Sequence, residues 1–369
     1  MTITKRNFLK ASGVALASLS VGKAALASSS SQAPIQKAAS SSTQLVNITA
    51  NVAAITVNER IARIAKAQQL MKQLNIAALV LEPGPTMDYF SGIQWWRSER
   101  VTALIIPQEG KVAVVCPFFE EPSIRETLAV GDDVRVWQEH ESPFIRVQQI
   151  LADRGIKKGN IAFEHSVRYF VLQGIMSQLP AMKDVSAVDI TRGCRMFKSE
   201  HELQLMHKAN EITLTAYQHV WSQLQVGMSQ ADVKAIMHSA QSQLGGSGIW
   251  NMALFNQASA YPHGTKQKQI LSHGSIVLMD CGCNVHGYQS DISRTFVFGE
   301  ANAKQKKIWN TVRQGQTIAF EKAQIGVEAG FVDDAVRAHY ETLGLGPDYK
   351  LPGLSHRTGH GIGMKGHEG

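Results

Sequence analysis

Hydrophobic residues in the first half of the chain recur at two spacings, one typical of helices and the other of strands. Residues 58–74 carry apolar side chains three and four positions apart, which predicts an amphipathic helix. Runs rich in β-branched residues then predict strands at 76–81, 101–106, 112–116, 134–137 and 161–164. Helical patterns at 121–130 and 143–154 lie between them, so we expect an α/β layer over residues 58–190.

The second half opens with longer helical patterns. One runs from residue 195 to about 224, with Ser199 as the candidate N-cap. A second runs to residue 244, and Ser229 and Asp232 have the spacing of a capping box. Apolar runs follow at 249–255 and 276–280, which predict strands.

This order of elements comes round again, with helical patterns at 304–323 and 331–343. Val226-Gly227-Met228 is echoed by Ile325-Gly326-Val327 at an offset of 99 residues, and Pro262-His263-Gly264 by Gly359-His360-Gly361 at an offset of 97. The two offsets predict an internal duplication. The counterpart of segment 276–297 would fall at 373–394, beyond Gly369, so we expect a fragment that ends before its last strands.

Segment 276–297 closes one apolar run with Asp280 and opens a β-rich run with Asp291. A hairpin that turns at Val285 and His286 would place the two aspartates opposite each other, with Cβ atoms about 5 Å apart. Two carboxylates so close repel, and one of them would take up a proton. Because a cation between them removes that repulsion, the hairpin predicts a metal site.

Three histidines, His263, His360 and His367, extend this candidate site. Carboxylate oxygens together with a neutral imidazole suit Mn, Fe, Co or Zn better than Ca. His356 and His360 have the spacing of a zinc-protease helix, but the glycines around His360 disfavour a helix and Arg357 stands where such sites carry their catalytic glutamate. His263 and His367 are then candidates to transfer protons or to stabilise a tetrahedral intermediate.

The four cysteines are too few and too scattered for a disulfide scaffold. Cys281 and Cys283 alternate with Asp280, so on a strand their side chains face away from that carboxylate. We expect buried thiols, with a zinc–thiolate site as the alternative.

The composition is that of a globular chain long enough for two domains, since 44% of its 369 residues are hydrophobic. No basic stripe with interleaved aromatic residues is present, so we expect no nucleic-acid partner. The adjacent Trp95 and Trp96 indicate either packing or a contact with a partner, such as a second copy in a homo-oligomer.

The first 27 residues match an export signal. Lys5 and Arg6 precede a short apolar run, and small residues lead to Ala27. The pattern is that of a twin-arginine signal with Lys5 in place of the first arginine, which predicts a periplasmic protein. The run is too short to span a membrane. Its removal would lower the net charge from +7 to +3 and leave residues 28–57 as a flexible leader.

Ordered motifs give the chain a resemblance to a known family. The motifs are Pro262-His263-Gly264, Asp280-Cys281-Gly282-Cys283, the stretch from Gly287 to Thr295 that holds Asp291, His356-Arg357-Thr358-Gly359-His360-Gly361, and His367-Glu368. In order and spacing they are similar to the pita-bread metallopeptidases, which include methionine aminopeptidase, aminopeptidase P, prolidase and the metal-free relative creatinase. The resemblance covers residues 58–369.

This resemblance implies a fold and a reaction. The α/β (α+β) fold would comprise a creatinase-type N-terminal domain over residues 58–190 and a pita-bread catalytic domain over 195–369, built from duplicated halves. A hydroxide activated by two divalent metal ions, with Mn first and Co, Fe or Zn as alternatives, would attack the carbonyl of an Xaa-Pro bond. The creatinase-type domain favours an Xaa-Pro peptidase over a methionine aminopeptidase.

The resemblance also implies residue roles. Asp280, Asp291 and His360 would bind the metals, with Asp291 bridging them. His263 and His367 would assist the tetrahedral intermediate, and His356 would line the site for a peptide with proline in second place.

The sequence departs from the family at its end, because two glutamate ligands on later strands are not in it. We therefore expect this chain to be a weak catalyst. Two alternatives stay open: a metal-dependent relative that acts on a small non-peptide substrate, as a lyase or C–N hydrolase, and a non-catalytic binding module.

Overall fold

The computed structural model describes residues 44–368. The predicted export signal at 1–27 and the leader up to residue 43 lie outside the described residues. Within the described range, every helix is too short or too polar to cross a membrane.

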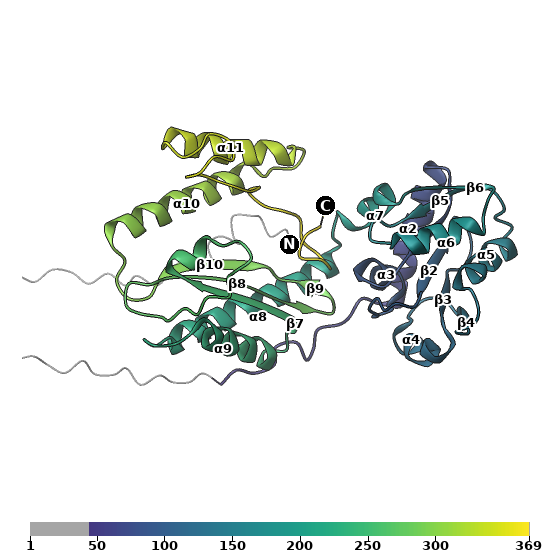
Figure 1. Ribbon diagram of the computed structural model, residues 1–369, viewed down its shortest axis with the longest axis horizontal. Coiled ribbons are helices and arrows are strands. Elements are labelled where there is room, and N and C mark those ends of the chain that lie inside the picture. Colours follow the sequence, from purple (N-terminus) through teal and green to yellow (C-terminus); the bar gives the residue numbers. More distant parts are fainter. Residues whose placement is uncertain (1–43, 369) are drawn as a thin grey trace, which may run out of the picture. The chain divides into compact units, whose positions relative to one another are not determined.

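The N-terminal half is built around a six-stranded sheet with the order β4-β3-β2-β1-β5-β6 (Figure 1). The strands are β1 (Ile76–Leu81), β2 (Ala103–Pro107), β3 (Ala113–Pro117), β4 (Asp133–Trp137), β5 (Gly159–Phe163) and β6 (Met182–Ser186). β2 pairs antiparallel with β1 and β3, whereas the other pairings are parallel. The predicted α/β layer is therefore confirmed.

Helices cover both faces of this sheet. They are α2 (Val57–Gln73), α3 (Pro85–Ser91), α4 (Glu121–Thr127), α5 (Pro143–Asp153), α6 (Tyr169–Ser177) and α7 (Val188–Arg195). Leu79 and Leu81 of β1 belong to one hydrophobic core, and Ala78 and Val80 to a second core on the opposite face. A strand buried on both faces is apolar throughout, which explains the continuous hydrophobic run at 76–81.

The second half contains a four-stranded sheet with the order β10-β8-β7 and with β9 beside β8. Its strands are β7 (Ser247–Phe255), β8 (Ile276–Val285), β9 (Tyr288–Gln289) and β10 (Ile292–Val297), and it is preceded by α8 (Glu200–Gln223) and α9 (Gln230–Gln243). The Tyr217 hydroxyl of α8 donates to the carbonyls of Met279 and Ile292 at 3.0 and 2.7 Å, which ties this helix to the sheet.

Alternate residues of β8 face α8 and the opposite side. Cys281 and Cys283 are fully buried as free thiols on the helix side, which confirms that prediction, and burial raises the pKa of Cys281 to about 12. Asp280 lies on the opposite, half-buried side. The sheet therefore presents its carboxylates away from the helix-covered core.

Both predicted helix caps are confirmed. The Glu202 N–H donates to the Ser199 hydroxyl at 3.2 Å, and the Ser199 N–H donates to the Glu202 carboxylate at 2.7 Å. Ser229 and Asp232 form the same reciprocal pair. Each capping box satisfies two N–H groups that the helix itself leaves unpaired.

A second helix pair follows the sheet, α10 (Ala303–Lys322) and α11 (Ala329–Thr342), and its two members pack together (Figure 1). Gly227 and Gly326, at φ 93° and 86°, lie in the corresponding turns of the two pairs, as the predicted duplication requires. Residues 343–368 form no strand beyond the isolated bridge between Gly361 and Glu368.

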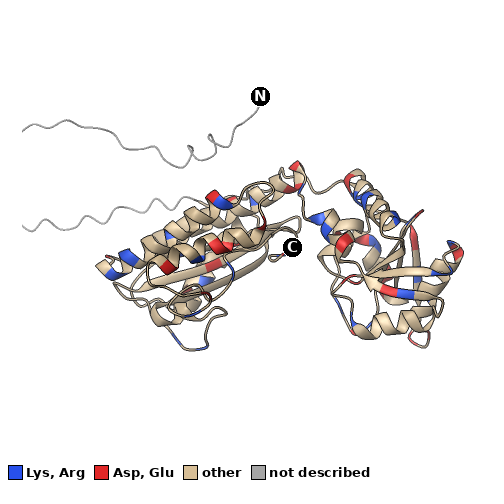
Figure 2. Ribbon diagram, turned by 90° about the horizontal axis from the view of Figure 1, so that it is seen from above, with Lys and Arg blue, Asp and Glu red and all other residues tan. Residues whose placement is uncertain are grey.

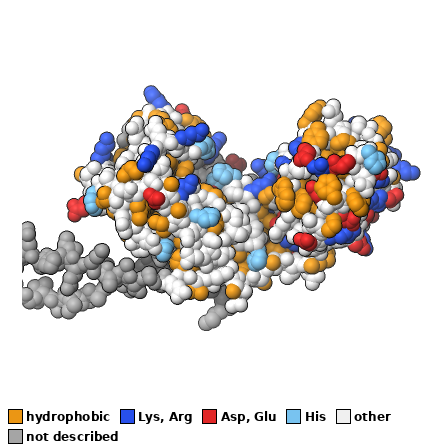
Figure 3. Space-filling model, turned by 60° about the horizontal axis from the view of Figure 1, so that its bottom comes forward, with side chains coloured by type: hydrophobic (Ala, Val, Ile, Leu, Met, Phe, Trp, Pro, Cys, Tyr) orange, Lys and Arg blue, Asp and Glu red, His pale blue; other side chains and the backbone are white. Residues whose placement is uncertain are grey.

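Charged residues of both signs are distributed along the helices and strands (Figure 2). On the face drawn in Figure 3, hydrophobic side chains are interspersed with charged groups and with several histidines. Four large apolar side chains of α10 are about half exposed or more: Ile308, Trp309, Val312 and Phe320.

A buried polar contact joins α2 to the second half of the chain. Arg63 pairs with Glu202 of α8 at 3.1 Å and donates to the Tyr288 hydroxyl of β9 at 2.8 Å. That hydroxyl in turn donates to Glu202 at 2.7 Å. Because each buried group has its partner, the cluster is satisfied.

Candidate metal site

The hairpin that carries the two aspartates turns one residue later than expected. His286 and Gly287 have φ of 48° and 85°, and they form the tight turn between β8 and β9, where Val285 pairs with Tyr288. Two successive positive φ values define a type I′ turn, and glycine adopts the second of them without strain. The predicted turn at Val285 and His286 was therefore wrong.

The register changes with the turn. Asp280 pairs with Ser293, not with Asp291, so the predicted direct opposition of the two aspartates was also wrong. The observed partner of Asp280 lies two residues beyond the predicted one. Because side chains on a strand alternate between the two faces of the sheet, a shift of two residues leaves every side chain on the face that was predicted. Asp280 and Asp291 consequently stay on the same side of the sheet as diagonal neighbours.

Ser290 interrupts the strand just before Asp291. Its hydroxyl accepts the Cys283 N–H at 3.1 Å and lies 2.7 Å from the Thr213 hydroxyl of α8. The Ser290 carbonyl instead lies against Gly282, where an added Cβ would come within 2.1 Å of it. The Cys283 N–H is thus bonded to the Ser290 hydroxyl and not to the Ser290 carbonyl, which would accept it in a regular antiparallel pair. Asp291, the next residue, lies outside β9 and β10.

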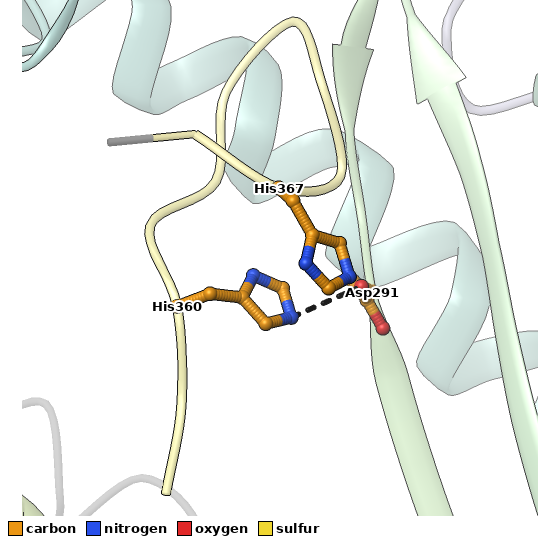
Figure 4. Close-up of side chains that lie close together, drawn as sticks. All are labelled: Asp291, His360 and His367. Atoms are coloured by element: carbon orange, nitrogen blue, oxygen red, sulfur yellow. Dashed lines mark ion pairs between the residues drawn. The ribbon is translucent and has the colours of Figure 1, made fainter. Parts of the chain in front are cut away.

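Asp291, His360 and His367 come together at this point, and a ligand atom of each lies within 4.8 Å of the other two (Figure 4). The Asp291 carboxylate lies 3.8 Å from His360 Nε2. The rings of His360 and His367 stack with their centroids 3.7 Å apart. His360 Nδ1 lies 3.0 Å from the Gly361 carbonyl, which favours the proton on Nδ1 and leaves Nε2 to bind a cation.

The electrostatics of Asp291 also suit a cation. Burial raises the pKa of its carboxyl above the ordinary value, and the negative charge of Asp280 raises it further, against the opposing effect of His360 and His367. A divalent ion would relieve both effects. One carboxylate and two imidazoles match the donor set of Mn, Fe, Co or Zn, so the residues present fit a divalent transition metal.

The other predicted residues do not join this group. Asp280 accepts a hydrogen bond from the Ser293 hydroxyl at 2.6 Å. His356 is exposed, and its Nδ1 lies 2.7 Å from the Arg357 carbonyl. His263 is exposed in the turn after η2 (Asn256–Ala260), and no described contact links it to Asp291 or His360.

Sequence reasoning missed the residues that hold the C-terminal segment. The Glu368 N–H donates to the Gly361 carbonyl at 2.9 Å, which closes the loop between His360 and His367. The Glu368 carboxylate pairs with Arg195 and, at 3.1 Å, with Lys198. Burial opposes ionisation of Glu368, but these cations lower its pKa below the ordinary value. Glu368 belongs to the motif His367-Glu368, but its partners lie about 170 residues earlier, so no local sequence signal predicts these contacts.

Two family models match this chain. Residues 63–197 match the creatinase/prolidase N-terminal domain, and residues 204–369 match metallopeptidase family M24. The chain is 29% identical to the putative dipeptidase YkvY of Bacillus subtilis over 83% of its own length and 84% of that protein. It is 30% identical to the probable dipeptidase PepE of Mycobacterium tuberculosis over 83% of its own length and 80% of that protein.

Solved structures give the same result. Dipeptidase PepE from Mycobacterium ulcerans superimposes with a TM-score of 0.77 at 28% identity, over 86% of this chain and 84% of that one. A prolidase from Thermococcus sibiricus, with a TM-score of 0.76 at 21% identity over 86% and 84% of the two chains, shares the fold. The predicted fold and family are confirmed: the chain is a metallopeptidase of family M24 with a creatinase/prolidase N-terminal domain.

Proposed function

We propose that this protein hydrolyses the peptide bond before proline in short peptides, with Xaa-Pro dipeptides as its first substrate class. The observation that carries the proposal is the group of Asp291, His360 and His367 within a chain of a metallopeptidase family. The dipeptidase names of its relatives and its creatinase/prolidase N-terminal domain support the choice of substrate.

We assign metal binding to Asp280, Asp291 and His360, with manganese as the first ion to test. A bound divalent ion would act as a Lewis acid and lower the pKa of a coordinated water. Asp291 interacts electrostatically both with Asp280 and with His360 and His367, and it is therefore the candidate bridging ligand. His360 would offer Nε2, which its Nδ1 contact leaves free.

The remaining residues are assigned to the substrate. His367, which stacks on His360, is the candidate to donate a hydrogen bond to an oxygen that develops negative charge at the site. His263 is the candidate partner in that role from the β7 side. His356 would contact the residue on the leaving side of the cleaved bond.

The test is hydrolysis by the purified full chain in the presence of Mn²⁺, with Ala-Pro, Ala-Pro-Ala and Ala-Ala compared under the same conditions. We expect Ala-Pro to be cleaved at least about tenfold faster than Ala-Ala, a difference in transition-state binding of about 1.4 kcal/mol. Cleavage of Ala-Pro-Ala at the same rate would indicate an aminopeptidase. If Ala-Ala is cleaved as fast as Ala-Pro, the proposed substrate class is wrong.

We also propose that the protein is exported to the periplasm, on the basis of residues 1–27 alone. Fractionation of a bacterial host that expresses the full chain tests this point. Recovery in the cytoplasm with an intact N-terminus would contradict it.

A further inference from the structure

Two buried charged residues of α11 hold the loop that leads to His360. Asp333 and Arg337 are 5% and 9% exposed on a helix whose other charged side chains face solvent. They lie four positions apart, and Arg337 Nε donates to the Asp333 carboxylate at 2.9 Å. A pair buried to this extent needs further partners to offset its desolvation.

The guanidinium of Arg337 finds those partners on the loop backbone. It donates at 2.7 Å to each of three carbonyl groups, those of Asp348, Leu354 and His356. It also lies 3.9 Å from the centre of the Tyr349 ring. A planar fork with five N–H donors can serve several acceptors at once, which a lysine ammonium cannot do in the same geometry.

Asp333 holds the next part of the same loop. It accepts the Thr358 N–H at 2.8 Å and the Thr358 hydroxyl at 2.6 Å. Burial alone would raise the pKa of Asp333, but the hydrogen bonds from Arg337 and Thr358 outweigh it and lower the pKa to about 2. The carboxylate is therefore ionised throughout the neutral pH range.

The two residues thus fix the chain on both sides of Arg357. His356 is held through its carbonyl by Arg337, and Thr358 through its amide by Asp333. His360 follows two residues later and reaches Asp291 at 3.8 Å. A segment that is neither helix nor strand has no regular backbone hydrogen bonds to fix its conformation. The hydrogen bonds from Asp333 and Arg337 provide that constraint.

We propose that Asp333 and Arg337 are positioning residues that hold segment 348–358 so that His360 faces Asp291 and His356 faces the substrate. The inference rests on the metal site of the proposed function. It adds that the site depends on a charged pair on α11 that contacts neither metal nor substrate.

The test uses three variants of the full chain and one control. Arg337→Met removes the guanidinium group, and Arg337→Lys keeps the positive charge without that group. Asp333→Asn keeps the size and shape of the side chain but removes its negative charge. Arg125→Met is the matched control, because Arg125 pairs with Glu121 four positions away on α4, at 2.7 Å, but contacts no part of the site. Melting temperatures establish whether each variant folds. If Arg337→Met does not fold, Arg337→Lys and Asp333→Asn still test the proposal.

The first measurement is hydrogen–deuterium exchange of segment 348–360 in the metal-free protein. We expect the Thr358 amide to exchange about tenfold faster or more in both Asp333→Asn and Arg337→Met. The first change makes the acceptor of that amide neutral, and the second removes the cation that holds the acceptor in place. The Arg125→Met control should match the wild type. Unchanged exchange in every Asp333 and Arg337 variant would overturn the inference.

The second measurement is the affinity for Co²⁺, followed by its visible absorption spectrum. Loss of groups that orient a ligand typically weakens metal affinity about 10-fold to 100-fold, so we expect at least about tenfold weaker binding in Arg337→Met and an intermediate value in Arg337→Lys. Faster loop exchange with unchanged affinity and spectrum would show a merely structural role and overturn the inference. A wild type that binds no cobalt would instead overturn the metal site of the proposed function.

Discussion

At the scale of single residues, the position of Asp291 depends on Ser290, whose hydroxyl accepts a backbone hydrogen bond that a strand carbonyl would otherwise accept. The buried Ser290 hydroxyl accepts the Cys283 N–H and contacts Thr213, and Asp291 follows at once. Gln241 extends the cluster by donating to Thr213 at 3.1 Å. The direction of Asp291 is therefore set from the helix side of the sheet, although the carboxylate itself lies on the other side.

We predict that Ser290→Ala weakens metal binding and lowers stability. The change leaves the buried Cys283 N–H without its acceptor and removes one of the partners of the Thr213 hydroxyl, which keeps Gln241. An unsatisfied buried group costs about 1–3 kcal/mol of unfolding free energy. Urea unfolding and Mn²⁺ titration measure the two effects.

Ser222→Ala is the control for this variant, because the exposed Ser222 hydroxyl donates to the His219 carbonyl of α8 and makes no other hydrogen bond within residues 44–368. It should change stability by less than about 0.5 kcal/mol. Equal effects of the two substitutions would contradict the role given to Ser290.

At the scale of elements, the contact between α2 and the start of α8 is expected to depend on pH. His201 Nδ1 lies 2.8 Å from the Glu59 carboxylate, and its Nε2 lies 3.1 Å from the Ala53 carbonyl. Both nitrogens face acceptors, so the doubly protonated ring is favoured. Burial opposes this, but the bonds to Glu59 and Ala53 outweigh it and raise the pKa of His201 above its ordinary value of 6.5.

A raised pKa in the folded state means that the stabilisation is fully present below pH 6.5 and is lost as the pH rises through the folded value. We therefore predict that His201→Gln destabilises the protein more at pH 5.5 than at pH 8. Unfolding free energies of wild type and variant across this range measure the difference. In a Glu59→Gln background the pH dependence should shrink, and its persistence there would contradict the assignment to this pair.

Features set by a few neighbouring residues, such as helix caps, were predicted correctly, whereas the pairing of residues across the hairpin was not. The caps at Ser199 and Ser229 were found because a capping box lies within four residues. The helix α3 lies between two predicted strands and was not predicted, although it begins at Pro85 and proline favours the first turn of a helix. The hairpin register was wrong because the pattern of apolar residues does not distinguish a turn at His286 and Gly287 from one that starts a residue earlier.

The candidate site shows the same limit. The sequence identified Asp291, His360 and His367, and the structure brings a ligand atom of each together. The sequence could not identify Asp333 and Arg337 as buried. An acidic and a basic residue four positions apart on a helix give the same sequence pattern whether the pair is buried or exposed. Burial here is decided by a loop that folds back over α11, and that is a property of the tertiary structure.

At the scale of the whole molecule, buried charges connect the segments that form the site. Arg63 of α2 meets Glu202 and Tyr288, and Tyr288 lies three residues before Asp291. Arg195 meets Glu368, which follows His367 directly. The segments that carry Asp291 and His367 are thus each held by a cation from an earlier part of the chain.

The central proposal is that Asp280, Asp291 and His360 bind a divalent metal. Isothermal titration of Mn²⁺ into the metal-free full chain tests it most directly, with Asp291→Asn as the comparison. We predict saturable binding by the wild type and at least about tenfold weaker binding by the variant, since a neutral amide replaces the anionic ligand that a divalent cation favours. A wild type that binds no Mn²⁺, or a variant that binds as tightly, would contradict the claim.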